Sequence, residues 1–409
     1  MITRLSLHNW KSFDHASLLI DQITFLIGTN ASGKSNIVDA MVFLSRLTTG
    51  AKLADICKSI RGGIDQIIRR GCNATQISIT FKANANEYRY TLQFSVEKAE
   101  ALLNSESLEV ATADHTWRTL FDTDTLPPND SSSQITVRVD KDRPGSKKEF
   151  RLRRDITVLA QVQGLNVLKV IKEGAGAALN TFASIYILDP APVKMRDYVQ
   201  LSETLNSDGS NVAGVIAALP EEEVPQFENM LTGYVSKLPE KDIRKIWAER
   251  VGRFKDTAML YCREDWGDPE DAMEIDARSM SDGTLRFIAI IVAMLTRQPD
   301  SLIVIEEIDN GLHPSRAGEL VHALTDIATR RDFDVLCTTH NPVLIDALSS
   351  EILHSVSCVT REGNHGTTSI FRLTERPDFL RQLAQYTPGG MMIKNILTST
   401  IHGKEGSYC

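Results

Sequence analysis

The feature that most constrains this chain is the segment Gly28–Ser35, which reads GTNASGKS. It fits the pattern GxxxxGK[ST], follows the apolar run Ile23–Ile27 and opens a helical pattern over residues 34–48. Glycines let such a loop wrap so that backbone N–H groups and the helix N-terminus face phosphate groups. A strand, a loop and a helix in this order predict a P-loop within an α/β domain.

The positions of this loop have distinct expected roles. Lys34 is expected to reach the β- and γ-phosphates of a nucleotide, and the hydroxyl of Ser35 to ligate Mg²⁺. The other predicted nucleotide-binding residues around the loop are Gly28, Asn30, Ser32, Gly33 and Asn36.

A second chemical feature is the acidic pair Glu306 and Glu307, directly after the apolar strand predicted at Leu302–Ile305. Ligands of parallel sheets bind at the carboxyl ends of the strands. Adjacent strand residues point in opposite directions, so two acids can have different roles. We expect Glu306 to hold Mg²⁺ and Glu307 to orient the attacking water.

Two weaker motifs gain meaning from their position relative to this pair. Ser281, 25 residues before Glu306, and Gly283 precede an apolar helix, whose N-terminus suits an anion. His340 lies 34 residues after Glu306, at the end of a strand predicted near 333–338. It is the candidate residue for contact with the γ-phosphate.

The order of these motifs resembles that of ABC-type ATPases, most closely the RecF/OLD/SMC-like branch that includes many bacterial AAA family ATPases. This resemblance implies an α/β fold, a P-loop NTPase head with a mixed sheet and helices on both faces, and binding of ATP and Mg²⁺. The stretches that carry it are ITRLSLHNWKSF at 2–13, LIGTNASGKSNIVDAM at 26–41, LNSDGSNVAGVIAAL at 205–219, SDGTLRFIAI at 281–290, IEEIDNGLHPSR at 305–316 and TTHNPVLID at 338–346.

The resemblance also implies a homodimer or higher oligomer in which two heads bind ATP head-to-tail. Ser281 and Gly283 would contact the γ-phosphate bound to the partner subunit, and Asp309 would lie in the D-loop that crosses the interface. A glutamine of the family joins the Mg²⁺ shell; Gln161 is the candidate for this metal ligand, with Gln163 as the alternative. Asn341 follows His340 where the family commonly has Ser, which leaves the rate of hydrolysis open.

The same motif order predicts the domain organisation. Residues 1–95 and 255–409 are expected to form one ATPase head that is split in sequence. Residues 96–254 are expected to form an inserted α+β second lobe, polar and β-rich over 97–155 and then helical over 156–250.

Composition restricts the cellular compartment and the binding partners that are expected for this chain. The longest apolar run, Phe287–Leu295, is too short for a membrane helix, and the N-terminus has no signal-peptide pattern. The 6 cysteines show no CxxC pairs, which predicts a cytoplasmic protein without a zinc site or disulfide framework. The net charge of −8 argues against nucleic-acid binding through bulk charge but leaves a local basic patch open.

Two functions are compatible with these features. The first is a switch, PtuA-like in architecture, that regulates a separate effector such as a nuclease of an anti-phage system. An intrinsic Toprim nuclease is not expected, because 69 residues follow His340. The second is a RecF-like DNA-binding ATPase of DNA repair or genome maintenance.

The DNA-binding hypothesis depends on the segment 141–154, which holds seven positive and two negative side chains. It is interpreted either as a DNA-contacting patch or as a solvated β-hairpin of mixed charge. The candidate DNA contacts are Lys147, Lys148, Arg151, Arg153 and Arg154.

Overall fold

The computed structural model describes residues 1–114, 116–140, 147–239, 242–265, 272–361, 366–383 and 385–394. The chain forms two compact units, each assembled from segments that are distant in sequence. Unit 1 consists of Met1–Tyr186, Asp300–Val304 and Ser355–Glu375. Unit 2 consists of Ile187–Pro299, Ile305–His354 and Arg376–Cys409.

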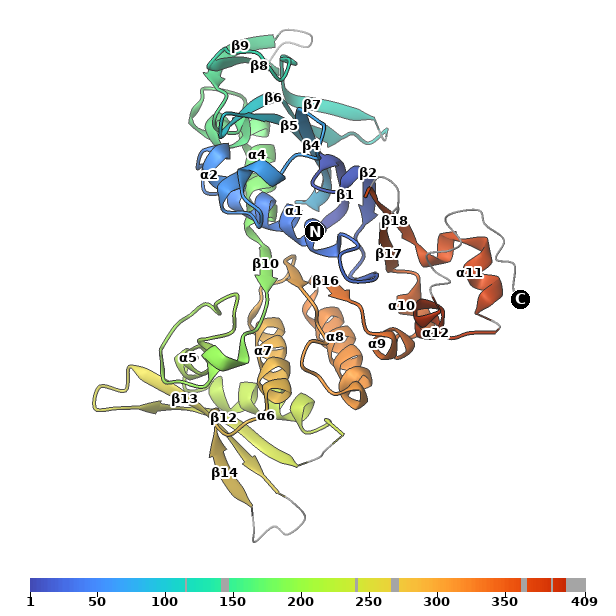
Figure 1. The fold of residues 1–409 in the computed structure, drawn as a ribbon. Helices are drawn as coiled ribbons and strands as arrows, with labels where there is room; N and C mark the ends of the chain where they lie inside the picture. The colour runs from blue at the N-terminus through green and yellow to red at the C-terminus, as the bar shows by residue number, and fades with distance from the viewer. Residues whose placement is uncertain are drawn as a thin grey trace. The chain divides into compact units, whose positions relative to one another are not determined.

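Unit 1 is built on a mixed sheet (Figure 1). Its strands follow the hydrogen-bonded order β3-β17-β18-β2-β1-β4-β5-β6-β7-β8-β9, parallel at β3–β17 and β18–β2 and antiparallel from β2 through β1 to β9. The strands are β1 (Ile2–Trp10), β2 (Phe13–Leu19), β3 (Ile23–Ile27), β4 (Ala74–Ala83), β5 (Asn86–Glu97), β6 (Glu100–Ala111), β7 (Trp117–Thr123), β8 (Gln134–Asp140), β9 (Lys147–Arg153), β17 (Val356–Arg361) and β18 (Thr368–Arg372).

Helices cover the antiparallel part of this sheet. Alternate residues of β4 and β5 are buried, which is the pattern of strands with one face against a core. Helix α4 packs on β4, β5, β6 and β7 and also touches α1. The rings of Phe43 and Phe94 stack with centroids 5.4 Å apart, and Phe182 of α4 meets Phe81 and Tyr90. The helices of unit 1 are α1 (Lys34–Leu47), α2 (Leu53–Lys58), α3 (Val158–Gln161) and α4 (Lys169–Ala183).

Unit 2 is organised around one buried helix. Every residue of α7 (Asp282–Thr296) from Gly283 to Leu295 is buried, and α7 packs against α5, α6 and α8. The other helices of unit 2 are α5 (Val212–Ala218), α6 (Val224–Val235), α8 (Ala317–Arg331), α9 (Pro342–Asp346), α10 (Ser350–Leu353), α11 (Pro377–Gln382) and α12 (Pro388–Ile393).

The strands of unit 2 include a small antiparallel sheet in which β13 pairs with β11, β12 and β14. Two further strands, β10 (Ile185–Leu188) and β15 (Leu302–Ile305), are each divided between the two units. The strands of unit 2 itself are β11 (Val199–Gln200), β12 (Ile243–Val251), β13 (Thr257–Glu264), β14 (Met273–Asp276) and β16 (Asp334–Thr339).

One secondary-structure prediction is wrong in this region. The helical pattern expected up to residue 250 ends earlier, because Ile243–Val251 forms β12. Its backbone pairs with β13 from Ile243↔Glu264 to Val251↔Thr257, and α6 packs on it. Cross-strand pairing and burial of Ile246 therefore override the local helical pattern. The split head (1–95 and 255–409) with an inserted lobe (96–254) stays a prediction.

Two features of the structure concern membrane spans and cysteines. Across the described ranges, no helix has both the length and the apolarity needed to cross a bilayer. The cysteines of the described part are free thiols, and Cys57, Cys262, Cys337 and Cys358 are buried.

A buried carboxylate joins the sheet of unit 1 to helix α3. Glu106 of β6 is 2% exposed. Its carboxylate accepts hydrogen bonds from the backbone N–H groups of Val158 (2.6 Å) and Leu159 (2.8 Å) and from the Tyr90 hydroxyl (3.0 Å). Burial raises the pKa of Glu106 to about 7, although these hydrogen bonds act in the opposite direction.

Glu106 should make folding stability depend on pH. The pKa of Glu106 in the folded chain, about 7, lies above the ordinary value of 4.5. Between pH 4.5 and 7, the folded chain therefore keeps a proton on Glu106 that the unfolded chain has lost. Stability should therefore fall as pH rises from about 4.5 to 7, by up to about 3 kcal/mol. We expect Glu106→Gln to lack this decrease when free energies of unfolding are measured at pH 5, 6, 7 and 8. Glu100→Gln, at an exposed position of the same strand, controls for loss of one carboxyl group. Parallel pH profiles of Glu106→Gln and wild type would contradict the assignment.

Candidate nucleotide-binding site

The predicted P-loop lies between a buried strand and a helix. All five residues of β3 are buried, and the chain then turns through Gly28–Gly33 into α1. The Lys34 amino group lies within this turn, where it donates to the carbonyl oxygens of Gly28 (2.7 Å) and Thr29 (2.9 Å). The loop therefore holds a buried positive charge beside the N-terminus of a helix, as phosphate binding requires.

Ser32 gives the loop an open hydrogen-bonding position. The residue is 1% exposed, and its Oγ has no hydrogen-bond partner among the residues that the structure describes. Its backbone N–H donates to Thr29. Because unpaired buried hydroxyls are costly, the chemistry around Ser32 fits a bound oxyanion.

Residues from distant strands brace the loop. The Thr368 hydroxyl at the start of β18 donates to Ser12 Oγ (2.7 Å), and it lies 3.0 Å from the carbonyl oxygen of Ser32. Gly33 has φ of 115°, and a Cβ there would lie 2.8 Å from Thr368 Oγ1. The side-chain amide of Asn36 donates to Ser12 Oγ (2.8 Å), so Asn36 supports the loop through Ser12. A residue larger than glycine at position 33 would displace this brace.

A polar cavity of about 380 Å³ adjoins the first turn of α1 in unit 1. Its lining includes Lys11, Ser12, Asn36, Asp65, Arg69 and Arg361. This volume lies within the range of small-ligand sites, so the cavity can take part of a ligand whose phosphates lie on the loop.

Unit 2 brings the predicted signature residues to the N-terminus of α7. Ser281 is exposed and caps the helix, accepting from the Thr284 N–H at 3.1 Å. A Cβ on Gly283 would lie 2.8 Å from the carbonyl oxygen of Gly311, so glycine permits close packing against the segment after the acidic pair. Arg316 of that segment donates to the Thr284 hydroxyl at 3.2 Å. The signature and the segment after the acidic pair therefore form one packed cluster.

The acidic pair ends the buried strand β15, as predicted. Both Glu306 and Glu307 are partly exposed, whereas Leu302–Ile305 is buried. Glu307 has a left-handed backbone, with φ of 46°. Its N–H donates to the Thr338 hydroxyl (2.8 Å), and its carbonyl oxygen accepts from the Asn310 N–H (2.8 Å).

The predicted γ-phosphate contact, His340, is exposed at the end of β16. Asp309 is 8% exposed and accepts a hydrogen bond from the Thr339 hydroxyl at 2.6 Å. The same hydroxyl accepts from the Asn341 N–H, and Asn341 caps α9. Thr339 thus ties the predicted D-loop to the residues that flank His340.

Family models match two segments of this chain. Residues 1–152 match the family model "AAA ATPase domain", and residues 192–346 match "AAA domain, putative AbiEii toxin, Type IV TA system". The DNA replication and repair protein RecF of Nocardioides sp. (strain ATCC BAA-499 / JS614) is 37% identical over 70 residues. That match covers 17% of this chain and 16% of the relative's length.

Solved structures show the fold. The Smc head bound to the C-winged helix domain of ScpA is similar with a TM-score of 0.51 and 13% identity, over 90% of this chain and 97% of that chain. The SMC head domain from Thermotoga maritima has a TM-score of 0.46 and 13% identity, over 91% of this chain and 98% of that chain. The chain is thus similar to AAA ATPase domains over two separate segments and to RecF over a short one. Its fold is the mixed α/β fold of a P-loop ATPase head.

In the structure, the side chains of the two candidate glutamines have other partners. The Gln161 side-chain amide donates to the carbonyl oxygens of Arg153 and Ile156, both at 3.0 Å, and its oxygen accepts from the Arg153 N–H. Gln163 donates to Lys172 (3.0 Å). A role for either residue in the Mg²⁺ shell stays a prediction, and it would require these local bonds to break.

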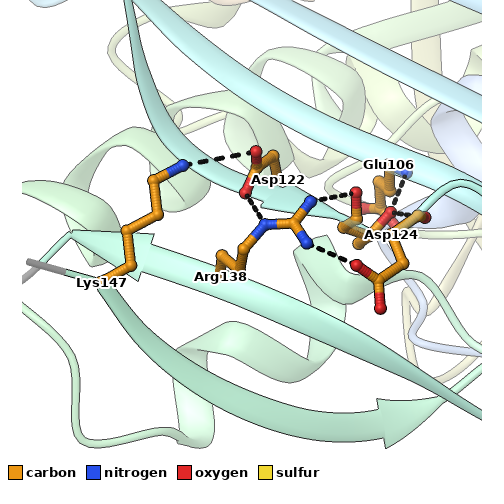
Figure 2. A network of polar contacts seen from close by, with 6 residues as sticks. Glu106, Asp122, Asp124, Arg138 and Lys147 are labelled. Atoms are coloured by element: carbon orange, nitrogen blue, oxygen red, sulfur yellow. Dashed lines mark hydrogen bonds and ion pairs between the residues drawn. The ribbon is translucent and has the colours of Figure 1, made fainter.

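The basic segment forms a hairpin of mixed charge. Residues 141–146 lie outside the described residues, and β9 pairs with β8 on either side of them. Figure 2 shows the charges that neighbour this hairpin: Arg138 lies between Asp122 and Asp124, and Lys147 reaches Asp122 at 3.4 Å. Lys148 donates to the carbonyl oxygen of Asn166. These partners match the interpretation of the segment as a hairpin of mixed charge.

One predicted DNA contact is wrong. Arg154 is 0% exposed, and its guanidinium donates to the carbonyl oxygens of Leu103 (2.8 Å), Asp130 (3.0 Å) and Ser132 (2.8 Å). A side chain buried and bonded in this way cannot reach a phosphate backbone. Arg153, which is exposed, forms an ion pair with Asp155.

Sequence reasoning missed several residues that support the site. The hydroxyls of Ser12 and Thr368 lie against the P-loop, that of Thr338 against the acidic pair, and that of Thr339 against Asp309. Two of them, Thr338 and Thr339, directly precede His340, and this position was the available signal. The other two, Ser12 and Thr368, are distant from the loop in sequence. They reach it only because of the order in which the strands pair.

On the hairpin of β1 and β2, His8, Asp14 and His15 present ligand atoms within 4.8 Å of one another. The Arg69 guanidinium lies 3.4 Å from the Asp14 carboxylate, and both nitrogens of His8 have polar neighbours, the carbonyl oxygen of Asp14 and the amide of Asn9. The arginine opposes a cation there, so we assign no metal to this cluster.

Gly33→Ala should weaken both the fold and nucleotide binding. The added Cβ would meet Thr368 and Ser12 in a backbone conformation that disfavours side chains, at a cost of about 1–3 kcal/mol. We expect a lower melting temperature and a smaller increase of that temperature on adding ATP and Mg²⁺. Gly318→Ala is the matched control, because Gly318 is an exposed helical position with open space around its Cβ. Equal behaviour of the two variants would contradict the bracing role of Gly33.

Proposed function

We propose that this chain binds and hydrolyses ATP and acts as a dimeric switch for a separate effector protein. The observation that carries the proposal is the P-loop, in which Lys34 points its amino group into the turn and Ser32 keeps a buried unpaired hydroxyl. The match to the AAA ATPase domain supports ATP as the nucleotide.

The residues of this chain have the following proposed roles. Gly28, Asn30, Ser32, Gly33 and Lys34 bind the phosphates through the loop and the N-terminus of α1. Ser35 and Glu306 supply the oxygen ligands that suit Mg²⁺. When bound, Mg²⁺ neutralises the negative charge that develops on the phosphates. Glu307 orients the attacking water, and His340 contacts the γ-phosphate.

The dimer of the proposal is head-to-tail. Ser281 is exposed at the N-terminus of a 15-residue helix, where the unpaired N–H groups of the first turn favour an anion. Asp282 beside it is held by Arg196 at 2.6 Å, which removes part of its repulsion of a phosphate. In the proposed dimer this helix end meets the nucleotide on the partner's P-loop.

The proposed output is regulation of a second protein, with a nuclease of an anti-phage system as the candidate effector. Two comparisons support a protein partner or a defence role. The similar Smc head was solved bound to a domain of ScpA, and one matching family model is described as a putative AbiEii toxin. The RecF relative supports the second candidate function, a DNA-binding ATPase of repair. The burial of Arg154 and the pairing of Arg153 and Lys147 favour the first.

Glu307→Gln should separate binding from hydrolysis. The variant keeps the P-loop, so it should bind ATP with wild-type affinity, whereas phosphate release should fall by about 100-fold or more. It should therefore accumulate as an ATP-bound dimer, measurable by light scattering. Lys34→Ala is the comparison, because it should lose ATP binding itself. Hydrolysis by Glu307→Gln at the wild-type rate would show that Glu307 does not orient the water.

The two candidate functions predict different effects of salt and of charged side chains on DNA binding. We expect Lys147→Gln/Arg151→Gln/Arg153→Gln, which neutralises exposed cations of β9, to leave any DNA binding unchanged. Binding that falls steeply with salt and is lost in this variant would support the RecF-like function instead. Lys98→Gln/Lys169→Gln/Lys172→Gln, which removes three positive charges of unit 1 outside β9, controls for net charge. The mass of the complex co-purified from the native operon would then identify the effector.

A further inference from the structure

A buried arginine links the signature helix to the acidic pair. Arg286 lies on α7, five residues after Ser281, and is 4% exposed within the otherwise apolar run from Leu285 to Leu295. A buried guanidinium is costly unless its donors are satisfied. Its position in a buried helix therefore requires a specific set of partners.

Those partners are backbone carbonyl groups at the end of β15. Nη2 of Arg286 donates to the carbonyl oxygens of Glu306 and Glu307, both at 3.1 Å. Nη1 donates to the carbonyl oxygen of Pro190 at 2.8 Å. Nη2 also lies 3.5 Å from a carboxylate oxygen of the mostly exposed Asp189. Two of the three carbonyl groups that Arg286 binds therefore belong to the acidic pair.

Glu307 needs such support because of its backbone conformation. A left-handed conformation is unfavourable for a residue with a side chain, and it persists where the surroundings determine it. Arg286 donates a hydrogen bond to the carbonyl oxygen of Glu307, and the Thr338 hydroxyl accepts one from the Glu307 N–H. The two contacts come from α7 and β16 and fix both peptide groups that flank the Glu307 side chain.

We propose that Arg286 is a positioning residue for hydrolysis. Its hydrogen bonds to the backbone carbonyl groups of Glu306 and Glu307 set the direction of the Glu307 carboxylate. The inference rests on the proposed role of Glu307. It adds that the orientation of this acid is coupled to the signature, because Ser281 and Arg286 are separated by about 7.5 Å along one rigid helix. A displacement of the helix N-terminus by a bound phosphate moves the Arg286 guanidinium and, with it, the Glu307 backbone.

The test compares Arg286→Lys with Arg154→Lys. Both residues are buried arginines that donate to three backbone carbonyl groups, but Arg154 lies at the end of β9 in unit 1. We expect Arg286→Lys to lower kcat by about 10–100-fold with little change in KM, since a small misplacement of a catalytic group has that effect. Arg154→Lys should lower the melting temperature and leave kcat and KM unchanged.

A second variant keeps the inference testable if Arg286→Lys does not fold. Thr338→Val removes the other support of Glu307 with almost no change of volume, and it should also lower kcat alone. In the Glu307→Gln background, neither Arg286→Lys nor Thr338→Val should lower the residual rate further. A purely structural role would lower the rate equally in both backgrounds and would overturn the inference.

The outcomes separate this inference from the proposed function. If Glu307→Gln hydrolyses ATP like wild type, the proposed role of Glu307 fails. If Glu307→Gln is inactive while Arg286→Lys and Thr338→Val keep the wild-type kcat, only the positioning role fails.

Discussion

The nucleotide-binding loop depends on a hydrogen bond between residues 356 positions apart. The Thr368 hydroxyl binds Ser12 and the carbonyl oxygen of Ser32, and it lies where any side chain at position 33 would have to go. The loop conformation is therefore not a local property of its eight residues. It forms when β18 is parallel to β2, which brings Thr368 opposite Phe13, next to the turn that carries Ser12.

The second cluster of the site is built in a similar way, from segments held together by polar side chains. The signature at the N-terminus of α7, the acidic pair after β15 and the end of β16 are joined by Arg286, Arg316 and two threonine hydroxyls. Each bond ends on a backbone group or a side chain whose position matters for the proposed chemistry. Buried polar networks of this kind specify one arrangement, because each unpaired member would be costly. This unit is thus suited to transmit a change at the signature to the acidic pair.

The sequence predicts the parts of the site whose chemistry is contained in short segments. The P-loop, the acidic strand end and the helix that starts at Asp282 combine turn residues, apolar runs and caps in local order, and the structure has these elements there. Thr368 and Ser12 could not be predicted, because their role comes from strand pairing across the whole chain. Arg286 could not be predicted either, since an arginine in an apolar helix gives no indication of its partners. The burial of Arg154 likewise depends on carbonyl groups of two distant segments, β6 and the loop at 130–132, which composition does not reveal. The residues Ile243–Val251 form β12 because they pair with β13, although their local pattern predicted a helix.

The central claim is that the loop of one chain and the signature of another form one ATP site. The direct measurement mixes Lys34→Ala subunits with Ser281→Arg subunits and follows phosphate release. Each variant alone should be inactive. In mixed dimers, one site combines the intact loop of one subunit with the intact signature of the other, so equal mixing should restore about a quarter of the wild-type rate. No restored activity in mixtures shown to contain mixed dimers would contradict a shared site.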